Sequence, residues 1–227
     1  MYQLYIANKN YSSWSLRPWV LMSELKIEFM ENMLPFGQES SWDSYRKICA
    51  SGKVPCLIDE NLMAWDSLSI VEYLAERHTG VWPADSTART WARSAAAEMH
   101  SGFSELRSRC AMSCGIRIRL HDFPTPLKRD ISRISELWNE GLHRFGGPFL
   151  AGNSFTAVDA FFAPVAFRIQ TYEISLDAIA TKYVARILNI QSMRRWYAEA
   201  LKEASRDGSH DKEILKMGTV VQDFRAT

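Results

Sequence analysis

The sequence predicts two parts of different fold class, an α/β part followed by an all-α part. In residues 1–80, short apolar runs alternate with segments of helical periodicity, which is typical of an α/β fold. From residue 81 onward, apolar residues recur almost only at helical spacing. The charge changes at the same place, from a net −3 in residues 1–80 to a net +4 in residues 81–227. We therefore expect a domain at 1–80, a proline-containing linker at 81–86 and an all-helical domain at 87–227.

The N-terminal domain is expected to form a small mixed sheet with helices packed on it. A first strand at 2–7 precedes a helix at 14–25, which carries Pro18 in its first turns, where proline is tolerated. The other expected elements are a strand at 27–34, a short helix at 42–49, strands at 55–58 and 62–65 joined by a hairpin turn, and a helix starting at Asp66.

The C-terminal domain is expected to be a helical bundle. Helical patterns fit residues 87–114, 127–145, 156–172, 178–189 and 191–204. Residues 116–120 alternate like a strand, but we interpret them as the end of the first long helix. The tail from Ser205 is polar and is expected to be a frayed or packed extension.

Composition excludes several classes of protein. The 27 basic and 26 acidic residues give a net charge of +1, which argues against a dedicated nucleic-acid binder. Hydrophobic residues make up 47% of the chain, as in folded globular proteins. No apolar run approaches the roughly 20 residues that span a bilayer, and the first residues lack the pattern of a secretory signal. We expect a cytoplasmic protein with no membrane or nucleic-acid partner.

The cysteines and histidines give no metal-binding pattern. Cys49, Cys56, Cys110 and Cys114 contain no Cys-x-x-Cys pair, so we expect buried, reduced side chains. The five histidines never stand four residues apart. The sequence therefore predicts no metal site built by protein ligands.

Three segments of the N-terminal domain could carry chemistry. The serines of Tyr11-Ser12-Ser13-Trp14 stand at the start of the first helix, where a hydroxyl either caps the helix or stabilises a bound anion. Pro55, preceded by Val54, stands at the first residue of a strand. Proline is common at the start of edge strands, where it has a purely structural role. Alternatively, it is a cis proline that leaves the Val54 backbone free to pair with an extended peptide.

The third segment is Asp66-Ser67 at the start of the last N-terminal helix. Either residue is an ordinary helix cap. The same groups could also hold an amino-acid head group, because Asp66 suits an ammonium group and Ser67 with the helix N–H groups suits a carboxylate.

The order of these segments, followed by a helical half, resembles the cytosolic glutathione transferase superfamily over nearly the whole chain. The resemblance implies a thioredoxin-like N-terminal domain with a mixed four-stranded sheet, a helical-bundle C-terminal domain and a homodimer. Val54-Pro55 is similar to the Val-cis-Pro that pairs with the cysteinyl part of glutathione, and Asp66-Ser67 to the pair that holds its γ-glutamyl group. Residues 154–159 resemble the family's helix-capping element, in which Thr156 caps and Asp159 reaches back.

The serine segment is similar to the Ser-Ser-Cys-Ser-Trp-Arg stretch of the zeta class and more loosely to the theta serine. Trp14 stands where the zeta class has its cysteine. The zeta arginine associated with substrate carboxylates aligns with Thr171, one turn after Arg168. Tyr11 adjoins the serines. The tyrosine classes of the family place their catalytic tyrosine earlier relative to the first helix, so we rank Tyr11 below the two serines.

The resemblance implies that a serine hydroxyl activates the glutathione thiolate for attack on a small electrophile. The zeta alignment selects Ser12 and the theta alignment selects Ser13, which we place slightly ahead. Lys53 and Ser40 are expected near the glutathione. Trp14, Met99, Phe103 and Arg107 are candidates for the electrophile pocket, where basic side chains would suit an anionic substrate.

Other activities remain open at this point. A glutathione-dependent isomerase, disulfide reductase or dehalogenase would use the same glutathione site. A non-enzymatic dimeric interaction module would use the fold alone, although retention of all three segments argues against it.

Overall fold

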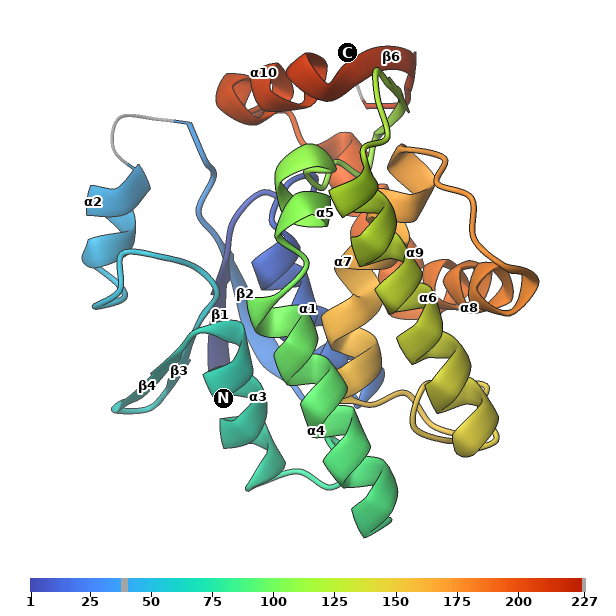
Figure 1. Ribbon diagram of the computed structural model, residues 1–227. Coiled ribbons are helices and arrows are strands. Elements are labelled where there is room, and N and C mark those ends of the chain that lie inside the picture. Colours follow the sequence, from blue (N-terminus) through green and yellow to red (C-terminus); the bar gives the residue numbers. More distant parts are fainter. Residues whose placement is uncertain (38–40, 226–227) are drawn as a thin grey trace.

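The structure is a computed structural model that describes residues 1–37 and 41–225 (Figure 1). A four-stranded sheet has the order β2-β1-β3-β4, in which β1 pairs in parallel with β2 and antiparallel with β3, and β3 pairs antiparallel with β4. The predicted mixed sheet is thereby confirmed. Its elements, in chain order, are β1 (Tyr2–Ile6), α1 (Ser13–Glu24), β2 (Phe29–Met33), α2 (Ser41–Arg46), β3 (Cys56–Asp59), β4 (Leu62–Trp65) and α3 (Ser67–Ala75).

The rest of the chain is mainly helical, as predicted. Its elements are α4 (Ser86–Ser101), α5 (Ser104–Arg109), β5 (Ile116–Leu120), α6 (Thr125–Arg144), α7 (Ala157–Thr171), α8 (Ala178–Asn189), α9 (Gln191–Lys202), α10 (Gly208–Met217) and β6 (Gly218–Asp223). The tail predicted to be frayed or packed forms α10 and β6, which lie at the top of Figure 1. No helix in the described residues is long and apolar enough to cross a membrane.

The interpretation of residues 116–120 as the end of a helix is wrong. They form β5, which pairs antiparallel with β6 from the far end of the chain. Ile116 and Ile118 are buried while Arg119 is exposed, so the alternation seen in the sequence does mark a strand. Its pairing partner, β6, is about a hundred residues away in sequence, so no neighbouring segment indicated a sheet.

The single helix predicted at 87–114 is also wrong, because two helices occupy that stretch. Helix α4 ends at Ser101, where Gly102 takes an extended conformation and Phe103 a left-handed one, with φ 57°. Helix α5 starts after this break, at Ser104. The helical spacing of the sequence continues across this break, which is why periodicity alone did not reveal it.

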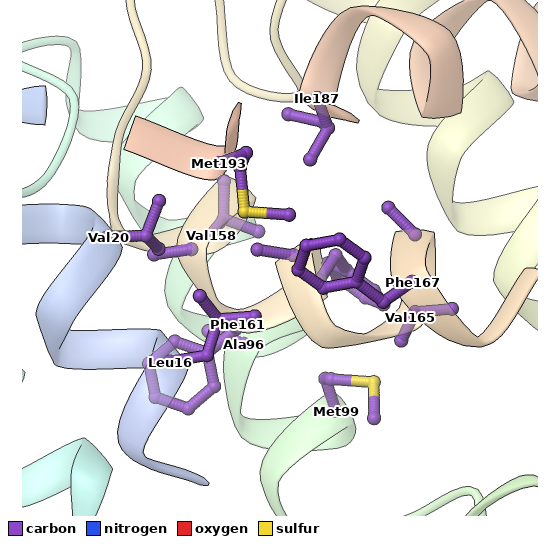
Figure 2. Packing of buried hydrophobic residues seen from close by; sticks show 14 of the residues in the cluster. Leu16, Val20, Ala96, Met99, Val158, Phe161, Val165, Phe167, Ile187 and Met193 are labelled. Carbon is purple, nitrogen blue, oxygen red and sulfur yellow. The ribbon is translucent and has the colours of Figure 1, made fainter. Parts of the chain in front are cut away.

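Helix α7 lies at the centre of the helical part and is buried along almost its whole length (Figure 1). It packs against α1 on one side and against α4 and α8 on others. Figure 2 shows Leu16 and Val20 of α1 together with Val158 and Phe161 of α7 in one packed cluster. One hydrophobic core therefore joins the sheet-bearing part to the helical part.

The capping element predicted at the start of α7 is present. The carboxylate of Asp159 accepts a hydrogen bond from the Thr156 backbone N–H at 3.0 Å, which closes back onto the residue that caps the helix. It also accepts from the Leu150 N–H at 3.0 Å and the Tyr183 hydroxyl at 2.9 Å. Asp159 is fully buried, so this element fixes the start of the central helix.

Candidate active site

The three segments singled out in the sequence meet at one end of the sheet. Strand β3 runs antiparallel to both β1 and β4, and Cys56 at its start pairs with Tyr5 near the end of β1 and with Trp65 at the end of β4. The serines that follow β1, the Val54-Pro55 pair that precedes β3 and the Asp66-Ser67 pair that follows β4 therefore emerge at the same edge. The topology brings together residues more than fifty positions apart.

A cavity of about 430 Å³ lies at this edge. The residues around it come from α1 and from the segments that flank β3 and β4, and they are Trp14, Ser51, Lys53, Val54, Pro55, Trp65, Asp66 and Ser67. All five of the glutathione contacts predicted within the described residues line it. The Val54–Pro55 peptide bond is cis, as the resemblance implied. Ser40, the sixth, lies outside the described residues.

Asp66 and Ser67 have different structural partners. Asp66 is the N-cap of α3 and accepts a hydrogen bond from the Leu68 N–H at 2.9 Å, with its own backbone at a positive φ of 69°. His100 of α4 places Nε2 3.6 Å from its carboxylate. Ser67 is buried, and its hydroxyl accepts a hydrogen bond from the guanidinium of Arg17 at 3.3 Å. Helix capping thus uses one carboxylate oxygen of Asp66, and it does not use the hydroxyl of Ser67.

A second cavity of about 510 Å³ adjoins the first and shares Trp14, Lys53 and Val54 with it. Its other lining residues come from both parts of the molecule, and they are Tyr11, Ser12, Ser13, Phe36, Trp42, Tyr45, Gly52, Arg107, Ala111, Met112, Arg168, His210 and Glu213. Both candidate serines therefore lie in this cavity, next to the side chains that it shares with the first. We call the first the peptide cavity and the second the serine cavity.

The two serines differ in what their hydroxyl groups do. Ser12 is the N-cap of α1 but makes no side-chain cap; its hydroxyl donates to the Ser15 hydroxyl at 2.7 Å, and only 5% of the residue is exposed. Ser13 is more exposed, and its hydroxyl oxygen accepts a hydrogen bond from Arg168 of α7 at 3.3 Å. The O–H of Ser12 is thus engaged within the protein, whereas Ser13 accepts and keeps its own O–H to donate.

Trp14 lines both cavities and has cationic and aromatic neighbours. The guanidinium of Arg17 lies 4.1 Å from its ring centre, and that of Arg107 lies 4.8 Å away. The His100 ring meets it edge to face at 5.3 Å. Such contacts stabilise an indole ring in one orientation.

The electrostatic environment of the site is dominated by arginines. Burial, with smaller contributions from the charges of Arg107 and Arg168, lowers the pKa of Arg17 well below its usual value. Burial also lowers the pKa of Arg168 to about 10 and that of Arg107. The pKa of His100 is lowered, first by burial and then by Arg17 and Arg107, against the opposing effect of Asp66. The site therefore favours a bound anion.

Helix α10 closes one side of the serine cavity. His210 stacks on Tyr11 at 5.3 Å and contacts Phe36 at 5.0 Å between ring centres, and Glu213 also lines the cavity. Arg225 donates to the Tyr11 hydroxyl at 3.1 Å. No motif in the polar tail indicated that it would fold back over the site, since this depends on tertiary packing.

The candidates for the electrophile pocket divide into two groups. Arg107 lines the serine cavity and Trp14 lines both cavities. Met99 and Phe103 instead belong to the hydrophobic core, with 2% and 7% of each residue exposed, and neither is among the described residues that line the two cavities. Figure 2 shows Met99 packed inside the core cluster. Their helical spacing indicated a buried face, which is where they lie.

Thr171, which aligns with the zeta arginine, does not face either cavity. Its hydroxyl donates to the Ser113 carbonyl at 2.5 Å and the residue is fully buried. Arg168, one turn earlier, reaches the serine cavity instead.

The four cysteines are buried and free, as predicted. Burial raises the pKa of the Cys110 thiol to about 12 and also raises those of Cys56 and Cys114. These thiols are therefore protonated and poorly reactive. Within residues 1–37 and 41–225, no cluster of three or more histidine, cysteine or acidic side chains could hold a metal ion.

Models of a known protein family match both parts of the chain. Residues 11–77 match the family model of the glutathione S-transferase N-terminal domain, and residues 89–189 match that of the C-terminal domain. No curated protein sequence matches the chain.

Solved structures share the fold at low sequence identity. A diazinon-metabolizing glutathione S-transferase from the silkworm Bombyx mori has a TM-score of 0.70 at 15% identity, over 88% of this chain and 97% of its own. A glutathione transferase homolog from Burkholderia GL BGR1, with bound glutathione, has a TM-score of 0.66 at 18% identity over 88% and 97%. Glutathione transferase Omega 3C from Trametes versicolor has a TM-score of 0.66 at 15% identity over 95% and 89%. With both family models covering most of its length, the chain belongs to the glutathione S-transferase family.

Proposed function

We propose that this protein is a glutathione transferase in which the Ser13 hydroxyl donates to the sulfur of glutathione. The observation that carries the proposal is the pair of adjoining cavities. The peptide cavity presents the residues suited to the glutathione backbone and head group, and the serine cavity presents a hydroxyl with a free O–H. The solved structure from Burkholderia GL BGR1, which contains glutathione, is consistent with this ligand.

In the proposed complex, glutathione lies extended through the peptide cavity. The Val54 backbone pairs with the cysteinyl residue, Asp66 receives the γ-glutamyl ammonium group, and Ser67 with the first N–H groups of α3 receives the adjacent carboxylate. Lys53 contributes positive charge beside the glycyl carboxylate. The sulfur then projects past Trp14 into the serine cavity, because Trp14 and Val54 line both spaces.

The chemical step follows from the charge on sulfur. A free cysteine thiol titrates at about 8.5, so only a few per cent is thiolate at neutral pH. The O–H of Ser13 and the positive end of α1 favour the thiolate, and the proton leaves to water because Ser13 acts as a donor. The thiolate forms a carbon–sulfur bond with the electrophile, and the leaving group departs with its electron pair.

The proposal also retains a small electrophile as second substrate, a homodimer and a cytoplasmic location. The buried cysteines support conjugation over a disulfide exchange that passes through a thiol of the chain. An assay of chloroarene conjugation beside one of disulfide reduction separates these two activities.

The role of Ser13 is tested by comparing Ser13→Ala with Ser12→Ala. Loss of one hydrogen bond to the thiolate is expected to raise the pKa of bound glutathione by about one unit and to lower kcat/KM near neutral pH roughly tenfold in Ser13→Ala. Ser12→Ala is expected to stay near the parental rate, because its O–H already serves Ser15. A Ser13→Ala protein that conjugates chlorodinitrobenzene at the parental rate would move the role to Ser12.

A further inference from the structure

Arg168 of α7 connects the helical part of the chain to the candidate catalytic serine. Its Nη2 donates to the Ser13 hydroxyl oxygen at 3.3 Å, and its Nη1 donates to the Cys110 carbonyl. The residue is 5% exposed and lines the serine cavity. Two residues 155 positions apart are thus held together by one rigid, planar group.

The contact with Ser13 determines how that hydroxyl can act. A serine hydroxyl has one O–H to donate and two lone pairs to accept. The guanidinium N–H occupies a lone pair and cannot itself accept, so the O–H of Ser13 is directed away from Arg168. The hydroxyl is thereby kept as a donor toward the cavity.

Arg168 is also a buried cation without an acidic partner in the described part of the chain. No carboxylate of residues 1–37 or 41–225 forms an ion pair with it, and its two hydrogen-bond partners are a carbonyl and a hydroxyl. A buried charge is costly unless it is paired. An anion at the Ser13 hydroxyl would supply the missing counter-charge.

We propose that Arg168 is a positioning residue that orients the Ser13 hydroxyl toward the glutathione sulfur and favours its thiolate form. This inference rests on the proposed function. It assigns part of the activation to α7, outside the N-terminal part that carries the predicted glutathione contacts.

A purely structural role for Arg168 is the alternative, and neighbouring residues of the same helix end allow it to be separated. Tyr172 donates to the Ala111 carbonyl at 2.9 Å and Thr171 to the Ser113 carbonyl. Together with the bond from Arg168 to Cys110, these bonds fasten the end of α7 to residues 110–113. Only Arg168 among the three also contacts Ser13, so Tyr172→Phe removes one fastening bond and leaves the serine untouched.

The Arg168 and Ser13 variants leave the other titratable groups around Arg168 unchanged. Tyr172→Phe removes one of them, the Tyr172 hydroxyl. Arg107, Cys110 and Tyr172 lie close enough to influence the pKa of Arg168, and Arg168 in turn lowers the pKa of Arg17. The serine cavity also presents Lys53 from the segment before β3, Tyr11 and Tyr45, and His210 with Glu213 from α10. A shift caused by Arg168→Met therefore reports the loss of its own guanidinium.

The experiment measures the ultraviolet absorbance of the thiolate of bound glutathione against pH in the full-length protein. Arg168→Met is expected to raise the pKa of the bound thiol by about one unit, Arg168→Lys by about half as much because it keeps the charge, and Tyr172→Phe not at all. In a Ser13→Ala background, Arg168→Met is expected to cause less than half the shift it causes alone, because most of its effect passes through Ser13.

Melting temperatures recorded for every variant separate folding from function. If Arg168→Met does not fold, the comparison of Arg168→Lys with Tyr172→Phe still decides, since only the first alters the group that holds Ser13. A thiol pKa that matches the parental value in both Arg168 variants, while Ser13→Ala raises it, would overturn this inference and leave the proposed function intact. A parental protein that binds no glutathione as thiolate would overturn both.

Discussion

At the scale of single residues, Asp66 shows how one side chain can serve both the fold and the site. It caps α3 through the Leu68 N–H and stands at the edge of the peptide cavity. Its backbone has a positive φ of 69° with ψ at 139°, and the asparagine side chain has nearly the same size and shape as that of aspartate. Asparagine therefore preserves the cap and the backbone but removes the charge.

Replacement of Asp66 by asparagine is expected to weaken glutathione binding with little change in melting temperature. Loss of a charged partner for the γ-glutamyl ammonium group corresponds to roughly a tenfold rise in the dissociation constant. Asp66→Ala should lose the affinity and, in addition, about 1 kcal/mol of stability from the missing cap. Calorimetric titration with S-methylglutathione measures the affinity, and parental affinity in Asp66→Asn would contradict the assignment.

At the scale of secondary-structure elements, α6 shows that packing can outweigh intrinsic preference. Gly141 lies in its last turn, and alanine is better than glycine inside a helix by about 1 kcal/mol. A Cβ at this position would stand 2.4 Å from the Trp91 ring and 2.6 Å from the Leu150 carbonyl oxygen. The carbonyl belongs to the backbone and cannot move aside as a flexible side chain could.

Gly141→Ala is therefore expected to destabilise the protein despite its better helix propensity. Overpacking of this kind costs about 1–3 kcal/mol, which exceeds the gain in propensity. Gly208→Ala, at the first residue of α10, is the matched control because, apart from its chain neighbours, no heavy atom of residues 1–37 or 41–225 lies within 4 Å of its added Cβ. Urea unfolding of both variants gives the free energies, and equal stability of the two would show that α6 has room to shift.

At the scale of the whole molecule, α1 and α7 join the two parts through one core. Phe161 is fully buried in the cluster that also contains Leu16 (Figure 2). The Arg17 guanidinium lies 4.8 Å from the centre of the Phe161 ring. Because the same helices carry Ser13 and Arg168, the packing that stabilises the fold also sets the geometry of the serine cavity. The molecule is therefore expected to unfold as one unit.

Phe161→Ala is expected to lower the free energy of unfolding by about 3–5 kcal/mol, the usual cost of removing a buried phenylalanine ring. Far-UV circular dichroism and tryptophan fluorescence should report one coincident transition in the parental protein and in the variant. Two separate transitions in either protein would contradict a shared core.

The sequence by itself determined the fold class and the place of the three candidate glutathione-binding segments. Their signals are local: alternating and helical spacing for the elements, and short motifs such as Val54-Pro55 and Asp66-Ser67 at element boundaries. The motifs also indicated the family fold. That fold implies the order and direction of the strands, which bring the motifs to one edge of the sheet.

Only the tertiary structure decided which residues complete the site. The contact of Arg168 with Ser13, the stacking of Arg17 on Trp14 and the return of α10 over the serine cavity all join residues distant in sequence. The same holds for β5, whose alternating pattern forms a strand only through pairing with β6. Such contacts depend on how helices pack in three dimensions. Helical spacing alone predicts which face of a helix is buried. It does not say whether that face meets the hydrophobic core, as for Met99, or lines a cavity, as for Arg168.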